Sequence, residues 1–370
     1  ALWSFERKPP TKEPDVHQHR ANVVPIMLAF FGLAAYIACG QTGRRPEPSK
    51  EPVVKPQPRK DLIIPGPPKA AEKAATAAAG PARVVLITVD GWHAKLTEHM
   101  PVWKEMTAAG SWTLDAEVPK GATTAISHAA LYTGADPEVN GVTREPDKIV
   151  DKDPHVHGVK FRWTPLKVSD TIFTATEAAG YKAKAVVQKG KLVGMLRPNG
   201  DETGIRVYGD AGLLKAACAD LRDDGVRLIV LHIGSPDGAG HNHGWLSEEQ
   251  FRAAEQVSDQ LRTLRTCIAD AEAAGGVPTT LIVTSDHGGT PVDVCQAKRH
   301  KDRCGHGAND ADNRRVPWIA IGPGIKPGHR IAAAIRLVDT APTILRILGI
   351  PTSSIPTLSG AEISEVFVRP

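Results

Sequence analysis

Three short apolar runs of this sequence each lead into an aspartate, a residue whose carboxylate can bind a metal ion. The runs and their aspartates are Val84–Val89 with Asp90, Arg227–Ile233 with Asp237, and Leu281–Ser285 with Asp286. One aspartate after a strand is weak evidence, because aspartate is also a common helix cap and turn former. Three of them in similar positions after an apolar run indicate a shared site.

Histidines accompany these aspartates. His241 follows Asp237 by four residues in the segment Asp-Gly-Ala-Gly-His, which we expect to be a Gly-rich loop folded around an ion; His287 directly follows Asp286, and His306 lies in another polar loop. Carboxylate and imidazole ligands together suit borderline divalent ions, zinc above all, with manganese or iron as alternatives. Because six such ligands are too many for one tetrahedral site, they favour two ions about 4 Å apart, an arrangement that supports phosphoryl transfer.

A candidate nucleophile begins a predicted helix. Thr124 opens the stretch Thr-Ala-Ile-Ser-His-Ala-Ala-Leu-Tyr-Thr before Gly134. The N-terminus of a helix favours anions, and a nearby metal ion activates a hydroxyl. Without metal motifs elsewhere in the chain, Thr124 would be interpreted as a helix N-cap.

The elements that must position these residues alternate between strands and helices. Val84–Val89 is a continuous apolar run, typical of a strand buried on both faces. The other predicted strands are Ala183–Gln188, Arg227–Ile233, Thr280–Thr284 and Val316–Ile321; the predicted helices are Lys95–Ala109, Asp170–Ala179, Asp210–Leu221, Ser247–Ala274 and Val338–Leu348. This alternation predicts an α/β fold with a mostly parallel central sheet and helices on both faces. Ligands of such sheets bind outside the carboxyl ends of the strands, where the three aspartates would converge.

Composition fits a globular catalytic domain, which we place at residues 84–370. Of the 370 residues, 41% are apolar and 23% are charged, and the net charge is only +4. So small an excess of positive charge argues against recognition of a nucleic acid duplex.

The first 83 residues differ from the rest. Val23–Cys39 is apolar and free of charge, and its last four residues, Tyr-Ile-Ala-Cys, resemble a lipoprotein cleavage box. We expect residues 1–39 to be a signal, lipoprotein or membrane-anchor segment, and residues 40–83, rich in Pro, Ala and Lys, to be a disordered linker. Both alternatives predict an exported protein, periplasmic or at the cell surface, anchored in the membrane by lipidated Cys39 or by an N-terminal helix.

Cysteine usage agrees with export. Besides Cys39 there are four cysteines: Cys295 and Cys304 in one polar loop, and Cys218 and Cys267 on two predicted helices. Each pair could form a disulfide in an oxidising compartment. For the pair on the helices, buried free thiols are the alternative.

Together, these motifs resemble the type I phosphodiesterase and nucleotide pyrophosphatase branch of the alkaline phosphatase superfamily. The resemblance rests on Val84–Gly91, Thr124–Gly141, Asp237–His241, Asp286–Gly288, His306, the segment WIAIGPGIKPG and Val338–Thr343, which occur in the right order over nearly all of residues 84–350. It implies an alkaline phosphatase-like three-layer sandwich. It also implies metal-dependent cleavage of a small phosphate ester, either a phosphodiester or a nucleotide pyrophosphate.

The resemblance further implies roles for single residues. One ion would be held by Asp90, Asp286 and His287 with Thr124 bridging, and the other by Asp237, His241 and His306. Thr124 would attack phosphorus in line, and water would hydrolyse the resulting phospho-threonine.

The sequence departs from the family pattern near the nucleophile. Ile126 stands where proline is usual, and Asn140 stands where histidine is common. Glu145 falls near the position of an asparagine that contacts phosphoryl oxygen in the phosphodiesterase members, and a carboxylate there would repel phosphate. Lys189 and Lys191 resemble a position where phosphate-specific relatives carry basic side chains, although two solvated lysines in a turn are the alternative.

Other activities are compatible with the same ligands. A phosphomonoesterase is the nearest alternative, followed by a phosphonate hydrolase, a phosphoethanolamine transferase and an inactive, metal-stabilised binding protein. A sulfatase is disfavoured because the residues from Thr124 onward are not the Cys/Ser-x-Pro-x-Arg setting that sulfatases need.

Overall fold

The computed structural model describes residues 82–145, 147–149, 160–162, 166–291 and 305–369. The predicted segment 1–39, nearly all of the predicted linker 40–83, and Cys295 and Cys304 lie outside the described residues. Among the helices that are described, none combines the length and the apolar character needed to cross a bilayer.

An eight-stranded sheet lies at the centre, in the order β10-β2-β9-β8-β1-β7-β5-β6. Its strands are β1 (Arg83–Val89), β2 (Ser111–Glu117), β5 (Lys182–Val187), β6 (Ile205–Val207), β7 (Val226–Ile233), β8 (Thr279–Thr284), β9 (Arg315–Ile321) and β10 (His329–Arg330). A separate antiparallel pair consists of β3 (Asp147–Ile149) and β4 (Lys160–Arg162).

The prediction of a mostly parallel sheet is confirmed. β8, β1, β7, β5 and β6 run in the same direction. The exception is β9, which contains the predicted strand Val316–Ile321 and runs antiparallel to both β8 and β2. Because β1 pairs in parallel with β7 on one side and β8 on the other, the carboxyl ends of these three strands meet at one edge of the sheet.

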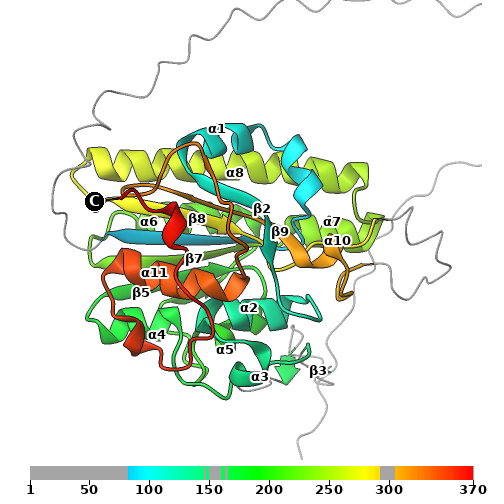
Figure 1. Cartoon of the computed structure of the whole chain (residues 1–370), viewed down its shortest axis with the longest axis horizontal. Coiled ribbons are helices and arrows are strands. Elements are labelled where there is room, and N and C mark those ends of the chain that lie inside the picture. The colour runs from blue at the N-terminus through cyan, green and yellow to red at the C-terminus, as the bar shows by residue number, and fades with distance from the viewer. Residues whose placement is uncertain (1–81, 146, 150–159, 163–165, 292–304, 370) are drawn as a thin grey trace, which may run out of the picture. The chain divides into compact units, whose positions relative to one another are not determined.

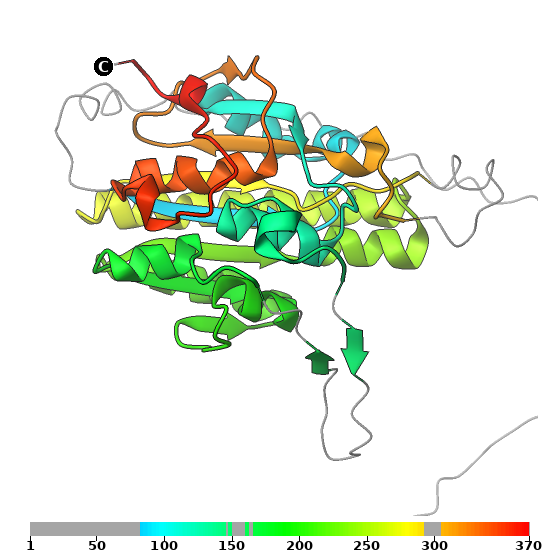
Figure 2. The same cartoon turned by 60° about the horizontal axis from the view of Figure 1, so that its bottom comes forward.

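Helices cover both faces of this sheet, as Figures 1 and 2 show. One face packs against α1 (Pro101–Ala109), α6 (Asp210–Asp220) and α8 (Glu248–Ala273), and the other against α2 (Thr124–Thr133), α4 (Ile172–Ala178), α5 (Val193–Leu196) and α11 (Thr340–Leu348). The other described α-helices are α3 (Pro137–Asn140), α7 (Ser235–His243) and α10 (Ala311–Arg314). The 3₁₀ turns are η3 (Ala94–His99), η4 (Gly190–Leu192), η6 (Leu337–Asp339), η7 (Thr352–Ser354) and η8 (Ser364–Val366).

The sequence of β1 explains why it lies inside the molecule. Val84 and Leu86 belong to the core on one face of the sheet, whereas Val85, Ile87 and Val89 belong to the core on the other. Side chains alternate between the two faces of a strand, so a continuous apolar run is compatible only with burial on both sides.

The predicted helix Lys95–Ala109 is wrong as one element. It is divided into η3 and α1 at Met100, whose backbone is extended (φ −115°, ψ 90°). Pro101 follows, and the proline ring disfavours helical geometry in the residue before it.

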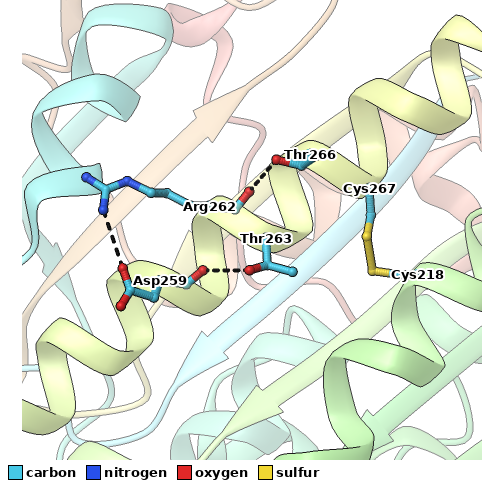
Figure 3. Close-up of a disulfide and its surroundings, with 6 residues drawn as sticks. All are labelled: Cys218, Asp259, Arg262, Thr263, Thr266 and Cys267. Atoms are coloured by element: carbon cyan, nitrogen blue, oxygen red, sulfur yellow. Dashed lines mark hydrogen bonds and ion pairs between the residues drawn. A yellow bond between two sulfur atoms is a disulfide. The ribbon is translucent and has the colours of Figure 1, made fainter. Parts of the chain in front are cut away.

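The cysteines of the two helices are joined. Cys218 of α6 and Cys267 of α8 form a disulfide, with their Cα atoms 5.6 Å apart (Figure 3). The predicted pairing is therefore confirmed, and the alternative of buried free thiols is wrong. The bond ties α6 to α8 on one face of the sheet.

Replacing either cysteine with alanine is expected to lower the free energy of unfolding by about 2–4 kcal/mol, because the disulfide closes a long loop of the unfolded chain. The two residues are 49 positions apart. Urea unfolding of Cys218→Ala, Cys267→Ala and the double variant should give the same loss, since each removes the same bond. An unfolding midpoint that does not move when wild type is reduced with dithiothreitol would contradict this expectation.

Candidate active site

The three predicted aspartates meet at the carboxyl end of the central strands. Asp90 directly follows β1, Asp286 lies just beyond β8, and Asp237 lies in the first turn of α7, which follows β7. All three carboxylates are buried. His287 lies among them, with its Nε2 atom 3.4 Å from Asp90 Oδ1, 3.3 Å from Asp286 Oδ2 and 4.0 Å from Asp237 Oδ1.

The segment from Asp237 to His241 is a helix, so the prediction of a Gly-rich loop is wrong. Pro236 stands at the start of α7, a position where its fixed φ favours helix formation. Residues four apart lie on the same face of a helix. Accordingly, His241 Nε2 lies 3.3 Å from Asp237 Oδ1, and His306 Nε2 reaches the same oxygen at 3.7 Å from a different loop.

The packing of Trp245 explains one glycine of α7, Gly240, and a second glycine, Gly289, that lies beyond β8. A Cβ atom on Gly240 would lie 1.3 Å from the buried Trp245 ring, and one on Gly289 would lie 1.2 Å from the same ring. Since Gly240 belongs to α7 and Gly289 follows His287 closely, the indole packs between the two segments that carry candidate ligands. The residue after Asp90 is also crowded: Gly91 has φ +69°, and a Cβ atom there would lie 2.8 Å from Asp237 Cα.

Each buried carboxylate has one oxygen held by the protein and one without a hydrogen-bond partner. Asp90 Oδ2 accepts a hydrogen bond from His232 Nε2 at 2.8 Å, and Asp286 Oδ1 accepts from the amides of Gly91 and His287 at 3.1 and 3.0 Å. Asp237 Oδ2 lies 2.7 Å from the ammonium of a neighbouring lysine. The remaining oxygens, Asp90 Oδ1, Asp237 Oδ1 and Asp286 Oδ2, are unpartnered.

His287 has the same division of roles. Its Nδ1 atom is 2.9 Å from the carbonyl oxygen of Gly288, so Nδ1 donates and Nε2 carries the lone pair. That Nε2 atom is buried and unpartnered. The site therefore contains four converging acceptor atoms without donors, which leaves them suited to a cation.

The ligand atoms form two overlapping groups, in each of which all atoms lie within 4.8 Å of one another. One group is Asp237, His241 and His306, and the other is Asp90, Asp237 and His287. Asp237 thus belongs to both groups. The chemistry of this donor set fits two borderline divalent ions such as zinc.

Burial shifts two of these groups toward their neutral forms. Burial, and then the charge of Asp90, raises the pKa of Asp286 to about 7. Burial, and then the nearby His287, lowers the pKa of His306 to about 3, so this imidazole is neutral at physiological pH and can offer a lone pair. The raised pKa of Asp286 indicates that the three carboxylates do not all ionise easily without added positive charge.

Lys189 provides part of that charge. Its Nζ atom lies 2.7 Å from Asp90 Oδ2, 2.7 Å from Asp237 Oδ2 and 3.2 Å from Thr124 Oγ1. Burial disfavours the ammonium, but the carboxylates of Asp90 and Asp237 outweigh burial and raise the pKa of Lys189 well above its usual value. Thr124 is the first residue of α2 and is buried, so the candidate nucleophile lies beside the ligand cluster.

Two further predicted residues lie at the N-terminus of α2. Glu145 Oε1 accepts a hydrogen bond from the amide of Ala125 at 2.6 Å, and Glu145 Oε2 lies 2.6 Å from Lys191 Nζ. Lys189 and Lys191 are therefore both largely buried and paired with carboxylates, so the interpretation of these residues as solvated lysines is wrong. Their predicted contact with substrate stays a prediction.

Sequence reasoning missed the contributions of His232 and His128. His232 Nδ1 accepts from the amide of Gln188, so the ring proton is on Nε2 and is donated to Asp90. His128 Nδ1 lies 2.8 Å from the carbonyl oxygen of Thr124 and 3.6 Å from Asp286 Oδ2. The available signal was a histidine within the apolar run of β7 and another within the buried helix α2.

Comparison with solved structures defines the class of fold. An inactive form of murine ectonucleotide pyrophosphatase/phosphodiesterase 5 in complex with AMP has a TM-score of 0.56 and 16% identity, covering 73% of this chain and 96% of that chain. The alkaline phosphatase PafA has a TM-score of 0.55 and 13% identity, covering 79% of this chain and 100% of that chain. The fold is thus alkaline phosphatase-like, as expected.

The family follows from the sequence model of type I phosphodiesterase/nucleotide pyrophosphatase, which matches residues 84–341. This chain belongs to that family, and the resemblance of its motifs is confirmed.

Similarity to curated proteins is more local. The 2,3-bisphosphoglycerate-independent phosphoglycerate mutase of Synechocystis sp. is 33% identical over 142 residues, which are 37% of this chain and 24% of that protein. Human ectonucleotide pyrophosphatase/phosphodiesterase family member 7 is 37% identical over 71 residues, which are 19% of this chain and 15% of that protein. The chain spans about a quarter or less of the length of these relatives.

Two glycines of α7 offer a matched test of how the site is packed. Gly240→Ala is expected to lower the free energy of unfolding by about 1–3 kcal/mol or more, because the added methyl group overlaps the Trp245 ring. Nothing lies within 4 Å of a Cβ atom placed on Gly238. Gly238→Ala should therefore be neutral or stabilise the protein by up to about 1 kcal/mol, as expected for alanine in a helix. Equal effects in urea unfolding would show that Trp245 does not pack as described.

Proposed function

We propose that this protein is a metal-dependent hydrolase that cleaves phosphate esters through a phospho-threonine intermediate on Thr124. The observation that carries the proposal is the group of four buried, unpartnered acceptor atoms next to the Thr124 hydroxyl. Membership of the phosphodiesterase and nucleotide pyrophosphatase family supports a phosphodiester or nucleotide pyrophosphate as substrate.

The residues would hold two divalent ions, for which the mixed carboxylate and imidazole ligands favour zinc. Asp90, Asp286 and His287 would hold one ion beside Thr124. Asp237, His241 and His306 would hold the other. When bound, such ions neutralise the carboxylates, activate the nucleophile and stabilise the charge of the leaving oxygen.

Thr124 performs the first step. Its Oγ1 atom, deprotonated, forms a bond to phosphorus while the bond from phosphorus to the leaving alcohol breaks, and the alcohol takes up a proton from solvent. The N-terminus of α2 stabilises the negative phosphoryl group at this position. In this structure, the Lys189 ammonium lies 3.2 Å from the attacking oxygen. A water then attacks phosphorus, the bond to Thr124 Oγ1 breaks, and the hydroxyl is restored.

The histidines and Trp245 act by positioning. His232 orients Asp90 so that its second oxygen faces the site, and His128 contacts both the first turn of α2 and Asp286. The packing of Trp245 between α7 and the loop after β8 holds the two halves of the ligand set together. Such supporting contacts keep reacting groups aligned.

The disulfide supports the proposal that the protein is exported. Structural disulfides persist in oxidising compartments and are rare in the cytosol. The bond between Cys218 and Cys267 thus supports an exported enzyme, periplasmic or at the cell surface.

Removing the nucleophile tests the mechanism. Hydrolysis of bis-p-nitrophenyl phosphate by the zinc-loaded full chain should fall about a thousandfold or more in Thr124→Ala, since the covalent step is lost. Thr124→Ser, which keeps a hydroxyl, should retain far more activity, and chelation should abolish turnover by wild type. Wild-type turnover that is metal-dependent but unchanged in a folded Thr124→Ala variant would contradict the nucleophile assignment.

A further inference from the structure

We infer that the Glu145 carboxylate competes with the substrate's phosphoryl group for the same position in the active site. This competition disfavours dianionic phosphate groups relative to monoanionic diesters. The inference rests on the proposed function, because it concerns the same site. It goes further by assigning the preference between diesters and monoesters to one side chain.

Glu145 accepts a hydrogen bond from the backbone amide that a phosphoryl group on Thr124 would need. Ala125 is the second residue of the ten-residue helix α2, and its N–H has no partner within the helix because it lies in the first turn. Glu145 Oε1 accepts this N–H at 2.6 Å, and a hydrogen bond from a backbone N–H at a helix N-terminus to a carboxylate is charge-assisted. In this structure, a carboxylate therefore takes the place of an anionic oxygen at the helix N-terminus.

The surrounding groups show that this position belongs to the active site. Thr124 directly precedes Ala125, and its Oγ1 atom contacts the Lys189 ammonium. Lys189 also contacts Asp90, whose other oxygen, Oδ1, is fully buried and unpartnered. A phosphoryl group bonded to Thr124 Oγ1 would therefore lie within reach of the same amide that Glu145 holds.

Lys191 partly neutralises the competitor. Its ammonium lies 2.6 Å from Glu145 Oε2, and its side chain is only 12% exposed, whereas that of Glu145 is 35% exposed. Glu145 can therefore rotate toward water while Lys191 stays close to the vacated amide. Displacement of Glu145 would give the incoming phosphoryl oxygen both the amide and a lysine.

The charge of the ligand sets the free-energy cost of placing its phosphoryl group near Glu145. A phosphodiester carries one negative charge near neutral pH, whereas a phosphomonoester and inorganic phosphate approach two. Repulsion from a nearby carboxylate scales with the charge of the ligand, so Glu145 penalises the dianions more strongly. The same repulsion favours release of a dianionic product.

Charge removal at Glu145 is the direct test. In the zinc-loaded full chain, Glu145→Gln should lower the ratio of kcat/KM for bis-p-nitrophenyl phosphate to that for p-nitrophenyl phosphate by about tenfold or more, mainly through a lower KM for the monoester. Inorganic phosphate should inhibit the variant about tenfold more strongly than wild type. Glu138→Gln, which removes the same charge from an exposed side chain of α3, should change neither quantity.

The outcomes separate this inference from the proposed function. An unchanged substrate ratio and unchanged phosphate inhibition in Glu145→Gln would overturn the inference, as would weaker phosphate binding, which would indicate that Glu145 only caps α2. Phosphate binding is also measured without turnover, by the thermal shift of the zinc-loaded protein. Tighter phosphate binding in Glu145→Gln by an enzyme that hydrolyses neither ester would support the inference and contradict the proposed function.

Discussion

The whole site depends on one electrostatic constraint, namely that buried acceptor atoms without donors must be compensated by positive charge. Asp90, Asp237, Asp286 and His287 each direct one lone-pair atom into the same water-poor space. Leaving such atoms uncompensated costs free energy, and buried carboxylates are especially costly. Lys189 compensates two of the carboxylates in part, while Asp286 remains easy to protonate. A pair of divalent ions satisfies the same constraint and supplies chemistry.

The sheet and its close contacts make this convergence possible. β1 is buried between β7 and β8, so its carboxyl end directs Asp90 toward the segments that follow its two neighbours. The backbone at Gly91 then approaches Asp237 more closely than any side chain would permit, and Trp245 fills the space between Gly240 and Gly289. Precise alignment of the reacting groups thus arises from tight packing around the site as well as from the candidate ligands themselves.

Much of the fold and of the residue cluster could be predicted because strong local signals coincide with tertiary geometry. The apolar run before Asp90 indicates both a buried strand and the edge where its ligands lie. By contrast, α7 could not be predicted, since its glycines disfavour a helix locally. The need for glycine at position 240 comes from Trp245, a partner beyond the helix. The contact between Glu145 and the Ala125 amide depends on a loop returning to α2, and no sequence pattern reports such a contact.

The mechanism requires that the unpartnered atoms at the end of β1 hold metal ions beside Thr124. The most direct measurement is a crystal structure of the zinc-loaded protein with anomalous diffraction recorded on both sides of the zinc absorption edge. Two zinc peaks are expected, one against Asp90, Asp286 and His287 and the other against Asp237, His241 and His306. The Lys189 ammonium should then be displaced from the carboxylates. Fully ordered side chains with no zinc peak between them, and Lys189 still bridging Asp90 and Asp237, would contradict the mechanism.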